Sequence, residues 1–306
     1  MRPLLSYMLL CFTAAPALAQ TAEAPLPTLK LGTQLVTVSA LARDGKGNPV
    51  MGLVKDDFTL TQDGHPQEIR YFSEGSSLPL TLALLVDTSG SQHAYIADEI
   101  KASQTFFHAM LRKPEDRATL VQFDNNVLQL QKMTSSVEDL EGALVHLNEP
   151  HDSALPNHGG GTMLWDGIWL AAQFELGKEP GRRAMVILTD GGDNGSRFSL
   201  GQAVAEAQIS NVALYPIFYG DQFANDAVWH KDNLQAIARI TGGRFFIVSP
   251  WQPLSAIYAQ IASDMRLQYQ LAYRPPESAP KTYHRIALRT KNHKLTVQAR
   301  EGFYSP

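Results

Sequence analysis

Residues 80–91 read LTLALLVDTSGS, an apolar run that ends in a polar loop. The run shows no alternation of apolar and polar side chains, which is typical of a strand buried on both faces of a parallel sheet. The loop places Asp87, Ser89 and Ser91 at alternate positions, and Gly90 lets the backbone turn tightly. We therefore predict a central strand that carries three oxygen-bearing side chains to one edge of a sheet.

The chain after this loop alternates between helix-like and strand-like segments up to about residue 265. Apolar runs bounded by turn residues predict further strands at residues 118–123, 127–130, 184–188, 212–219 and 244–248. Periodic segments between them predict helices at residues 92–111, 136–147, 163–176, 200–210, 231–240 and 252–265. This alternation predicts an α/β domain over residues 78–265, with a doubly wound, mostly parallel, Rossmann-like sheet.

The segments before and after the α/β domain have the sequence pattern of short β-strands. In residues 30–77, we expect strands at 35–42, 58–61 and 68–72, the last two forming a hairpin around Asp63-Gly64. In residues 266–306, strand patterns fall at 267–273, 283–290 and 295–300. Segments of about 40 to 50 residues bury too little surface to be stable alone. We therefore expect the two segments to pair into one β-sandwich, with the α/β domain inserted between them.

Residues 1–19 have the pattern of a signal peptide, because an apolar stretch follows Arg2 and a small-x-small cleavage pattern ends at Ala19. We predict export to the periplasm or the medium, a linker at residues 20–29, and no membrane-spanning segment in the mature chain. An uncleaved membrane anchor is the alternative, but the apolar stretch is shorter than the roughly 20 residues that a spanning helix needs. The single cysteine, Cys11, lies in this segment, so the mature chain has no thiol for disulfides or zinc sites.

The charge of the chain gives no support for nucleic-acid binding. The formal net charge is −4, and it becomes more negative when Arg2 is removed. The basic residues near the C-terminus are most simply side chains on solvated strand faces: Lys281, Arg285, Arg289, Lys291, Lys294 and Arg300. We therefore expect neither nucleic acid nor an anionic membrane as a partner.

Two further polar loops accompany the first. A glycine run ends in Thr162 at the start of a predicted helix, and Asp190 follows a predicted strand. Because ligands collect at the carboxyl ends of parallel strands, we expect these residues to meet the first loop there. The combined hydroxyl and carboxylate oxygens suit Mg²⁺, Mn²⁺ or Ca²⁺ and suit zinc or copper poorly. The predicted metal ligands are Asp87, Ser89, Ser91, Thr162 and Asp190.

This arrangement resembles the metal-ion-dependent adhesion site of von Willebrand factor type A (VWA) domains, whose ligand positions all match. The resemblance covers about residues 78–265. It implies that the serines and the threonine bind the metal directly or nearly so, while the aspartates act largely through water. The flanking segments, with their motifs at residues 44–50 and 302–304, resemble those of exported bacterial VWA-related proteins.

Each polar residue of these loops also has a simpler interpretation. Ser91 could cap the following helix, and Asp87 could merely stabilise a turn. Asp166, one helical turn after Thr162, either orients a ligand from outside the ligand shell or is a solvated helix residue. Asp193 is expected to be a turn residue rather than a ligand.

The histidines and tryptophans give weaker signals. His151 and His158 are expected on a surface loop, because no third nitrogen or thiolate ligand accompanies them. Trp165 and Trp169 lie at helical spacing, which is typical of core residues. Trp229 lies in a polar stretch and is a candidate for an exposed contact.

The predicted site favours a binding function over catalysis. Mg²⁺ would keep water ligands and one exchangeable position there, which an acidic side chain of a protein partner could fill. We do not expect an enzyme, because the chain has no G-x-S-x-G motif, its glycine run lacks the lysine of a phosphate-binding loop, and no general base is evident. The alternatives are a structural protein whose cation only stabilises loops, and a metal-dependent hydrolase.

Overall fold

The computed structural model describes residues 35–75, 78–112, 114–149 and 161–305. The predicted signal peptide and linker lie outside these residues, as do His151 and His158. No helix within the described ranges has both the length and the apolar character that crossing a membrane requires.

The α/β part is built on a six-stranded sheet with the strand order β10-β9-β8-β5-β6-β7. Neighbouring strands are parallel except β6 and β7, which are antiparallel. The strands are β5 (Leu80–Asp87), β6 (Arg117–Phe123), β7 (Val127–Thr134), β8 (Arg182–Thr189), β9 (Val212–Phe218) and β10 (Phe246–Ile247). The apolar run predicted as the central strand is β5, and every one of its residues is buried. The prediction of a doubly wound, mostly parallel α/β sheet is confirmed.

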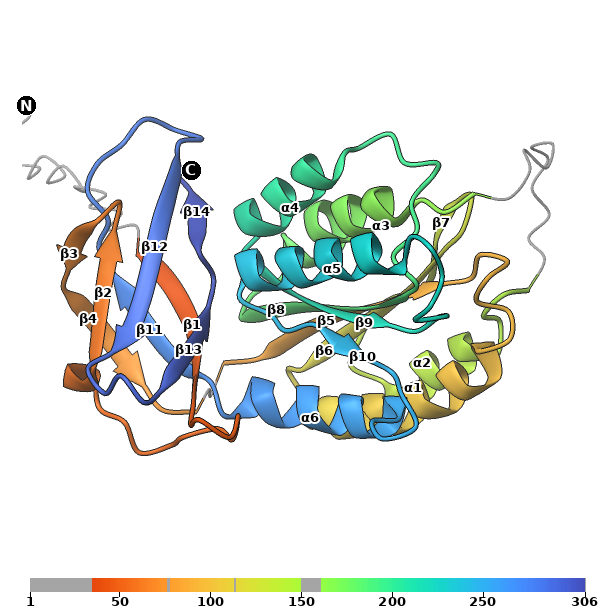
Figure 1. The fold of residues 1–306 in the computed structure, drawn as a ribbon, viewed down its shortest axis with the longest axis horizontal. Helices are drawn as coiled ribbons and strands as arrows, with labels where there is room; N and C mark the ends of the chain where they lie inside the picture. The colour runs from red at the N-terminus through yellow and green to blue at the C-terminus, as the bar shows by residue number, and fades with distance from the viewer. Residues whose placement is uncertain (1–34, 76–77, 113, 150–160, 306) are drawn as a thin grey trace, which may run out of the picture. The chain divides into compact units, whose positions relative to one another are not determined.

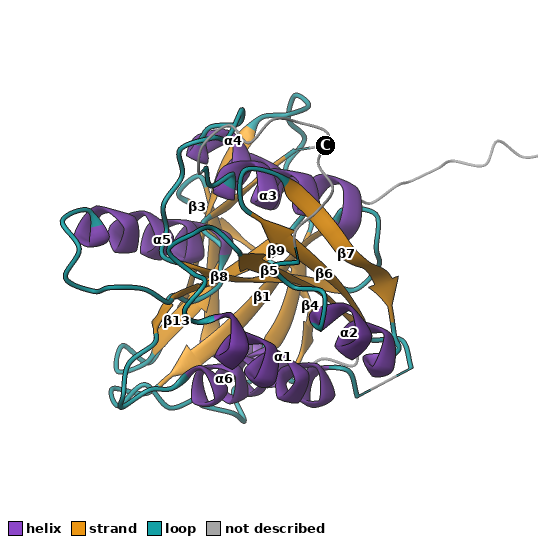
Figure 2. Cartoon of the chain, turned by 90° about the vertical axis from the view of Figure 1, so that its right-hand side faces the viewer, coloured by secondary structure: helices purple, strands orange, loops and turns teal. Residues whose placement is uncertain are grey.

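Helices cover both faces of this sheet (Figure 1 and Figure 2). One face carries α1 (Ile96–Met110), α2 (Val137–Leu144) and α6 (Leu254–Arg266). The other carries α3 (Leu164–Leu170), its π-helical continuation η2 (Ala171–Leu176), α4 (Leu200–Ile209) and α5 (Ala227–Thr241). Successive side chains of β5 point to opposite faces of the sheet. Leu84 packs in the core with α1, α2 and α6, and Leu85 packs in the core with α3, α4 and α5. Burial on both faces explains the lack of polar alternation in this strand.

The first helix begins at Ile96 rather than at the predicted residue 92. The residues before it form turns, in which the amide of Gln92 donates to the carbonyl of Ser89 at 2.9 Å and the amide of Tyr95 donates to the carbonyl of Gln92 at 2.8 Å. The N-cap residue is Tyr95. The interpretation of Ser91 as the cap of this helix is therefore wrong, since the polar loop extends by a turn before the helix starts.

The segments that flank the α/β part form two four-stranded sheets, with the orders β13-β1-β11-β4 and β14-β12-β2-β3. The strands are β1 (Val36–Arg43), β2 (Phe58–Gln62), β3 (His65–Gln67), β4 (Ile69–Ser73), β11 (Tyr269–Tyr273), β12 (Tyr283–Thr290), β13 (Thr296–Ala299) and β14 (Gly302–Tyr304), and a short 3-10 helix, η1 (Lys55–Asp57), precedes β2. Both sheets combine strands from the two flanking segments. Their side chains share one core that includes Val38, Leu60, Leu271 and Ile286. The expected β-sandwich is confirmed.

The pairing inside the N-terminal segment differs from the prediction. β2 does turn at Asp63-Gly64, but its hairpin partner is the short strand β3. β4, predicted as the second arm, pairs instead with β11 in the opposite sheet. The predicted hairpin between residues 58–61 and 68–72 is therefore wrong, because the chain changes sheet after Gln67. A strand pattern along the sequence does not reveal which distant strand offers the better partner.

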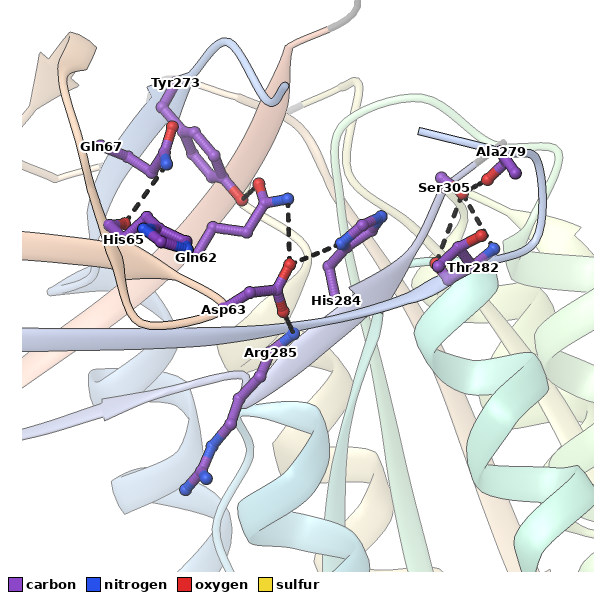
Figure 3. Close-up of polar contacts among 10 residues, drawn as sticks. All are labelled: Gln62, Asp63, His65, Gln67, Tyr273, Ala279, Thr282, His284, Arg285 and Ser305. Carbon is purple, nitrogen blue, oxygen red and sulfur yellow. Dashed lines mark hydrogen bonds and ion pairs between the residues drawn. The ribbon is translucent and has the colours of Figure 1, made fainter. Parts of the chain in front are cut away.

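Polar contacts fix the β2 turn to the C-terminal strands (Figure 3). Asp63 has the left-handed φ of 50° and accepts a hydrogen bond from the amide of Arg285 at 2.8 Å. Its Oδ2 lies 2.7 Å from Nδ1 of His284, and this contact is the main reason why the pKa of Asp63 is lowered. Next to it, the hydroxyl of Tyr273 donates to Oε1 of Gln62 at 2.9 Å, which links the two sheets.

A buried ion pair joins the sandwich to the α/β part. Nη2 of Arg43 in β1 lies 2.5 Å from Oδ2 of Asp264 in α6, and Nη1 of Arg244 lies 3.4 Å from the same oxygen. Burial raises the pKa of Asp264, and the two guanidinium groups oppose that rise. The pair therefore connects the two parts through side chains, and loss of Asp264 would leave the buried guanidinium of Arg43 without its ion-pair partner.

Candidate metal centre

The end of β5 places Asp87 in the interior at the carboxyl end of the sheet. Its side chain is fully buried, and its two oxygens have different partners. Oδ1 accepts the amide hydrogen of Ser89 at 3.0 Å, and Oδ2 accepts the hydroxyl hydrogen of Thr189 at 2.6 Å. The turn contact proposed as a simpler interpretation of Asp87 is therefore present. It occupies only one of the two oxygens.

The surroundings of Asp87 disfavour its negative charge. The pKa of Asp87 is raised to about 6, mainly by burial and to a smaller extent by the charge of Asp190, against the opposing hydrogen bonds from Ser89 and Thr189. Neither aspartate forms an ion pair with a basic side chain of the described residues. A cation between these carboxylates would relieve the cost of keeping them ionised.

The two predicted serine ligands lie side by side in the loop after Asp87. Oγ of Ser89 lies 3.2 Å from Oγ of Ser91. Ser89 is 9% exposed and Ser91 is exposed, so this pair runs from the buried carboxylate toward solvent. Two hydroxyl oxygens at this separation can face one cation, because hydroxyl groups offer lone pairs without adding charge.

Thr162 is fastened to the loop that follows β8. Its amide donates to Oδ1 of Asn194 at 2.6 Å, and the amide of Asn194 donates back to the carbonyl of Thr162 at 3.1 Å. The amide of Met163 in turn donates to the carbonyl of Asp124 at 2.7 Å. Thr162 is 8% exposed, and its position therefore depends on loops from two other strands.

Asp190 lies directly after β8, where two neighbouring segments pack tightly against it. Its Oδ1 accepts the amide hydrogen of Gly192 at 3.1 Å, and its carbonyl oxygen lies 3.1 Å from Nδ1 of His230 in α5. Gly191 has a φ of +83°, and a Cβ there would come within 2.8 Å of Cβ of His230. A Cβ on Gly220 would come equally close, at 2.8 Å, to Cβ of Asp190. Glycine is therefore required on both sides of this aspartate.

The structure thus brings the predicted ligands to one edge of the sheet in linked groups. Asp87, Ser89 and Ser91 share one loop, and Asp190 lies close enough to Asp87 to raise its pKa. Thr162 is attached to the loop that begins at Asp190. Within the described residues, no group of three or more His, Cys, Asp or Glu side chains is placed to hold a metal ion. A cation at this edge would therefore depend on the hydroxyl groups, and this donor set fits Mg²⁺, Mn²⁺ or Ca²⁺.

Two residues at this site were not predicted from the sequence. Thr189 donates to Asp87 and also accepts the amide hydrogen of Gly191 at 2.9 Å, so it connects the ends of β5 and β8. Asn194 fixes Thr162. Both residues lie close to Asp190 in the sequence, and this closeness could have indicated them as part of the site. Polar side chains near the end of a buried strand need hydrogen-bond partners in the neighbouring loops.

Glu99 is a buried acid that the sequence pattern did not indicate. It lies in α1 with both carboxylate oxygens buried and without a hydrogen-bond partner among the described residues, and Gln92 is buried in the same way. The pKa of Glu99 is raised to about 8, mainly by burial and to a smaller extent by the charges of Asp87 and Asp98. Glu99 is therefore mostly protonated at neutral pH, which limits the negative charge beside Asp87.

The other two acidic residues of this region, Asp166 and Asp193, accept hydrogen bonds from backbone amides. Asp166 is buried rather than solvated, and its Oδ1 accepts the amide hydrogens of Arg197 at 2.8 Å and Phe198 at 2.9 Å. Asp193 accepts hydrogen bonds from the amide of Trp165 and the hydroxyl of Ser196. Both carboxylates thus connect α3 to the loop after β8.

Three large aromatic side chains are exposed in or next to the loops after β9 and β10. Phe223 is 94% exposed, Trp229 is 63% exposed and Trp251 is 93% exposed. We call these three residues the aromatic rim. Their loops are joined, because Nε2 of Gln222 donates to the carbonyl of Val248 at 3.0 Å. Trp229 also precedes His230, the residue that contacts the carbonyl of Asp190. The prediction of an exposed Trp229 is confirmed.

Comparison with solved structures gives several similar proteins. The vWF domain of the type V pili tip protein Mfa5 from Porphyromonas gingivalis is 15% identical, with a TM-score of 0.49 over 61% of this chain and 95% of that one. A von Willebrand factor type A protein from Catenulispora acidiphila is 12% identical, with a TM-score of 0.49 over 82% of this chain and 73% of that one. Proximal thread matrix protein 1 from the mussel byssus, with a zinc-occupied MIDAS motif, is 19% identical, with a TM-score of 0.48 over 68% of this chain and 50% of that one.

A family model gives the more direct assignment. No curated protein matches the chain. Residues 82–192 match the model of the von Willebrand factor type A domain. This match contains β5 from residue 82 onward, all of β8, and the positions Asp87, Thr162 and Asp190. Within the α/β part, residues 82–192 are therefore similar to von Willebrand factor type A domains, and the α/β part is called the VWA domain below.

Proposed function

We propose that this protein is an exported binding protein that uses a divalent cation to contact an acidic side chain of a protein partner. The cation would be held by Asp87, Ser89, Ser91, Thr162 and Asp190. The observation that carries the proposal is the buried Asp87 with the partly buried Asp190 near it. Hydroxyl groups lie beside Asp87, and no basic side chain of the described residues forms an ion pair with either aspartate.

The cation is proposed to be Mg²⁺, with Mn²⁺ and Ca²⁺ as alternatives, because every donor is a hard oxygen. Such an ion would supply one exchangeable position for a partner carboxylate. The zinc in the MIDAS motif of the mussel protein makes Zn²⁺ a further ion to test.

The aromatic rim supports a protein as the partner. Exposed tryptophan and phenylalanine side chains are enriched where proteins bind one another, because they bury much apolar surface with few rotatable bonds. Phe223 and Trp251 lie in the joined loops after β9 and β10, and Trp229 lies in α5 next to His230, which contacts the carbonyl of Asp190. We propose that the partner places an acidic side chain on the cation and apolar side chains on this rim.

We propose a binding role rather than an enzymatic one, and export by the signal peptide at residues 1–19. Asp87 is the carboxylate with a strongly raised pKa in the centre, but it is fully buried and hydrogen-bonded, which suits a structural ligand better than a general base. A cation that only stabilises the three loops remains the alternative, and the experiments below separate the two.

Cation binding can be tested by calorimetric titration of Mg²⁺, Mn²⁺, Ca²⁺ and Zn²⁺ into the chain from residue 20. We expect binding to the wild type and a loss of at least about tenfold in affinity for Thr162→Ala and Asp190→Asn, which is about 1.4 kcal/mol. Asp232→Asn removes an exposed carboxylate of α5 outside the centre and is the matched control. Equal affinities for all four proteins would disprove the metal centre.

The partner contact needs a second experiment. We expect a pull-down from envelope extract to retain a protein with Mg²⁺ and to lose it with EDTA. Trp251→Ala should weaken retention without changing the Mg²⁺ titration. Retention that survives EDTA, together with a lower melting temperature of the metal-free protein, would show that the cation only stabilises loops.

A further inference from the structure

A cavity of about 180 Å³ lies between the sandwich and the VWA domain, away from the metal centre. The VWA domain contributes Arg182, Arg183 and Tyr215 to its wall, and the sandwich contributes Gln270 and the residue after β13, Arg300. Among the described residues that line it, none carries a carboxylate. The cavity is therefore lined by three guanidinium groups and no opposing charge.

The polar atoms around this cavity include several unused hydrogen-bond donors. Nε of Arg182, Nε of Arg300 and Nε2 of Gln270 are buried and have no hydrogen-bond partner among the described residues. Oε1 of Gln270 already accepts the hydroxyl hydrogen of Ser39 at 3.0 Å, which leaves its amide nitrogen as the free end. Buried donors are normally paired, so an acceptor is expected in the cavity.

Acidic side chains act on two of the three arginines only through longer-range charge, Asp116 on Arg182 and Glu179 on Arg183. None of the three arginines forms an ion pair with a described residue. All three donate to backbone carbonyl groups instead: Nη1 of Arg182 to Met265, Nη1 of Arg183 to Ser210 at 2.7 Å, and Nη2 of Arg300 to Thr37 at 2.6 Å. These bonds fix the guanidinium groups without neutralising them.

Burial shifts the pKa values of the three arginines downward. It lowers the pKa of Arg182 and Arg183, and it lowers the pKa of Arg300 to about 10. Part of the Arg300 side chain reaches solvent, but its Nε is buried. The interpretation of Arg300 as a residue on a solvated strand face is therefore wrong. All three groups stay charged at neutral pH, and an anion would offset the cost of burying them.

We propose that this cavity binds a small inorganic oxyanion of the phosphate or sulfate type, which connects the sandwich to the VWA domain. Such an ion accepts several hydrogen bonds at once and matches guanidinium geometry. A cavity of about 180 Å³ has room for one such ion with ordered water.

Thermal unfolding of the chain from residue 20 tests this proposal in sodium phosphate, sulfate, acetate and chloride at pH 7.5 and equal ionic strength. We expect phosphate and sulfate to raise the melting temperature in a saturable way, by about 2 to 4 °C relative to chloride. Acetate should have little effect. A rise with acetate alone would assign the cavity to carboxylates and overturn the proposal.

Two variants separate a bound ion from the general stabilisation that phosphate and sulfate give to proteins. Arg300→Met removes one cavity charge, whereas Arg289→Met removes an exposed arginine of β12 that does not line the cavity. We expect Arg289→Met to keep the saturable rise and Arg300→Met to lose it, each relative to its own melting temperature in chloride. Equal responses would overturn the proposal.

Gln270→Glu gives an independent test that does not remove a cavity arginine. The new carboxylate keeps the acceptor for Ser39 and places a fixed negative charge in the cavity. We expect this variant to melt at a higher temperature than the wild type in chloride and to show no further rise with phosphate. A variant that melts lower and still responds to phosphate would contradict an anion site.

Discussion

The hydroxyl of Thr189 donates to Oδ2 of Asp87 over 2.6 Å and joins the ends of two neighbouring parallel strands. The same oxygen of Thr189 accepts the amide hydrogen of Gly191. One hydroxyl group therefore holds both the buried carboxylate and the loop that carries Asp190. We infer that the geometry of the metal centre depends on this threonine, although it is not one of the predicted ligands.

Replacement of Thr189 by valine should weaken cation binding. Thr189→Val keeps the shape of the side chain but removes a hydrogen bond to a carboxylate, which contributes about 1.5 to 3 kcal/mol. We expect the affinity for Mg²⁺ to fall about tenfold or more in a calorimetric titration. Thr189→Ser retains the hydroxyl and should bind almost as the wild type does. A serine variant as weak as the valine variant would mean that packing, rather than the hydroxyl, matters.

Cation affinity should depend on pH through Asp87. Because its pKa is raised to about 6, the carboxylate becomes protonated below that pH and stops attracting the cation. We expect the affinity to be nearly constant above pH 7 and to fall about tenfold for each pH unit well below 6. Titrations at pH 5.0, 6.0 and 7.5 check this. Equal affinity at pH 5.0 and 7.5 would exclude Asp87 as a titrating ligand.

Glu99 should make the metal-free protein less stable as the pH rises. Its pKa is raised from 4.5 to about 8, so the folded state holds a proton that the unfolded state has already released. The contribution is complete below pH 4.5 and is lost progressively up to about pH 8, with a slope of at most about 1.4 kcal/mol per pH unit.

The variant Glu99→Gln isolates this effect, because glutamine mimics the protonated acid at every pH. We expect the free energy of unfolding of the wild type, measured with urea in the presence of EDTA, to fall relative to Glu99→Gln between pH 5 and pH 8. Above about pH 8 the difference should become constant. A difference that does not change with pH would mean that Glu99 is ionised in the folded protein.

Two substitutions at Asp63 should separate charge from backbone conformation in the sandwich. Asp63→Asn keeps a residue that tolerates the left-handed φ of 50° but loses the charge beside His284. Since the Asp63 side chain is 44% exposed, we expect a cost below about 1 kcal/mol. Asp63→Ala should cost about 1 kcal/mol more, because alanine is strained at this φ.

The pH dependence of Asp63 has the opposite sign to that of Glu99. Because its folded-state pKa lies below 3.8, its contribution is present above about pH 4 and is lost as the pH falls through the folded value. Urea unfolding of the wild type and Asp63→Asn at pH 3 and pH 6 measures this. We expect the difference between the two proteins to be smaller at pH 3 than at pH 6. Equal differences at both pH values would contradict the role of the charge.

The sequence was most informative where local chemistry decides the outcome. The unbroken apolar run of β5 is typical of a strand that is buried on both faces of a sheet. The polar loop follows the last residue of this strand, so it lies at the edge of the sheet. Asp190 follows the end of β8 for the same reason. The α/β sheet, and the loops that form the candidate centre, could therefore be predicted without coordinates.

What could not be predicted depends on contacts between distant segments. Asn194 acts on Thr162 through a loop whose path only the folded chain defines. Glu99 lies in an acidic helical turn that suggests exposure, yet it faces the core. Arg300 follows an alternating strand whose pattern does not show that the VWA domain covers it. The partner of β4 is likewise separated from it by the whole α/β domain.

The pairing of β1 with β11 and β13 has a consequence for biosynthesis. Both neighbours of this early strand leave the ribosome only after the entire VWA domain has been made. A chain that stops before residue 269 would therefore present β1 with two open edges, which are templates for aggregation. Both edges of β1 can therefore be covered only after the chain has been synthesised through β13.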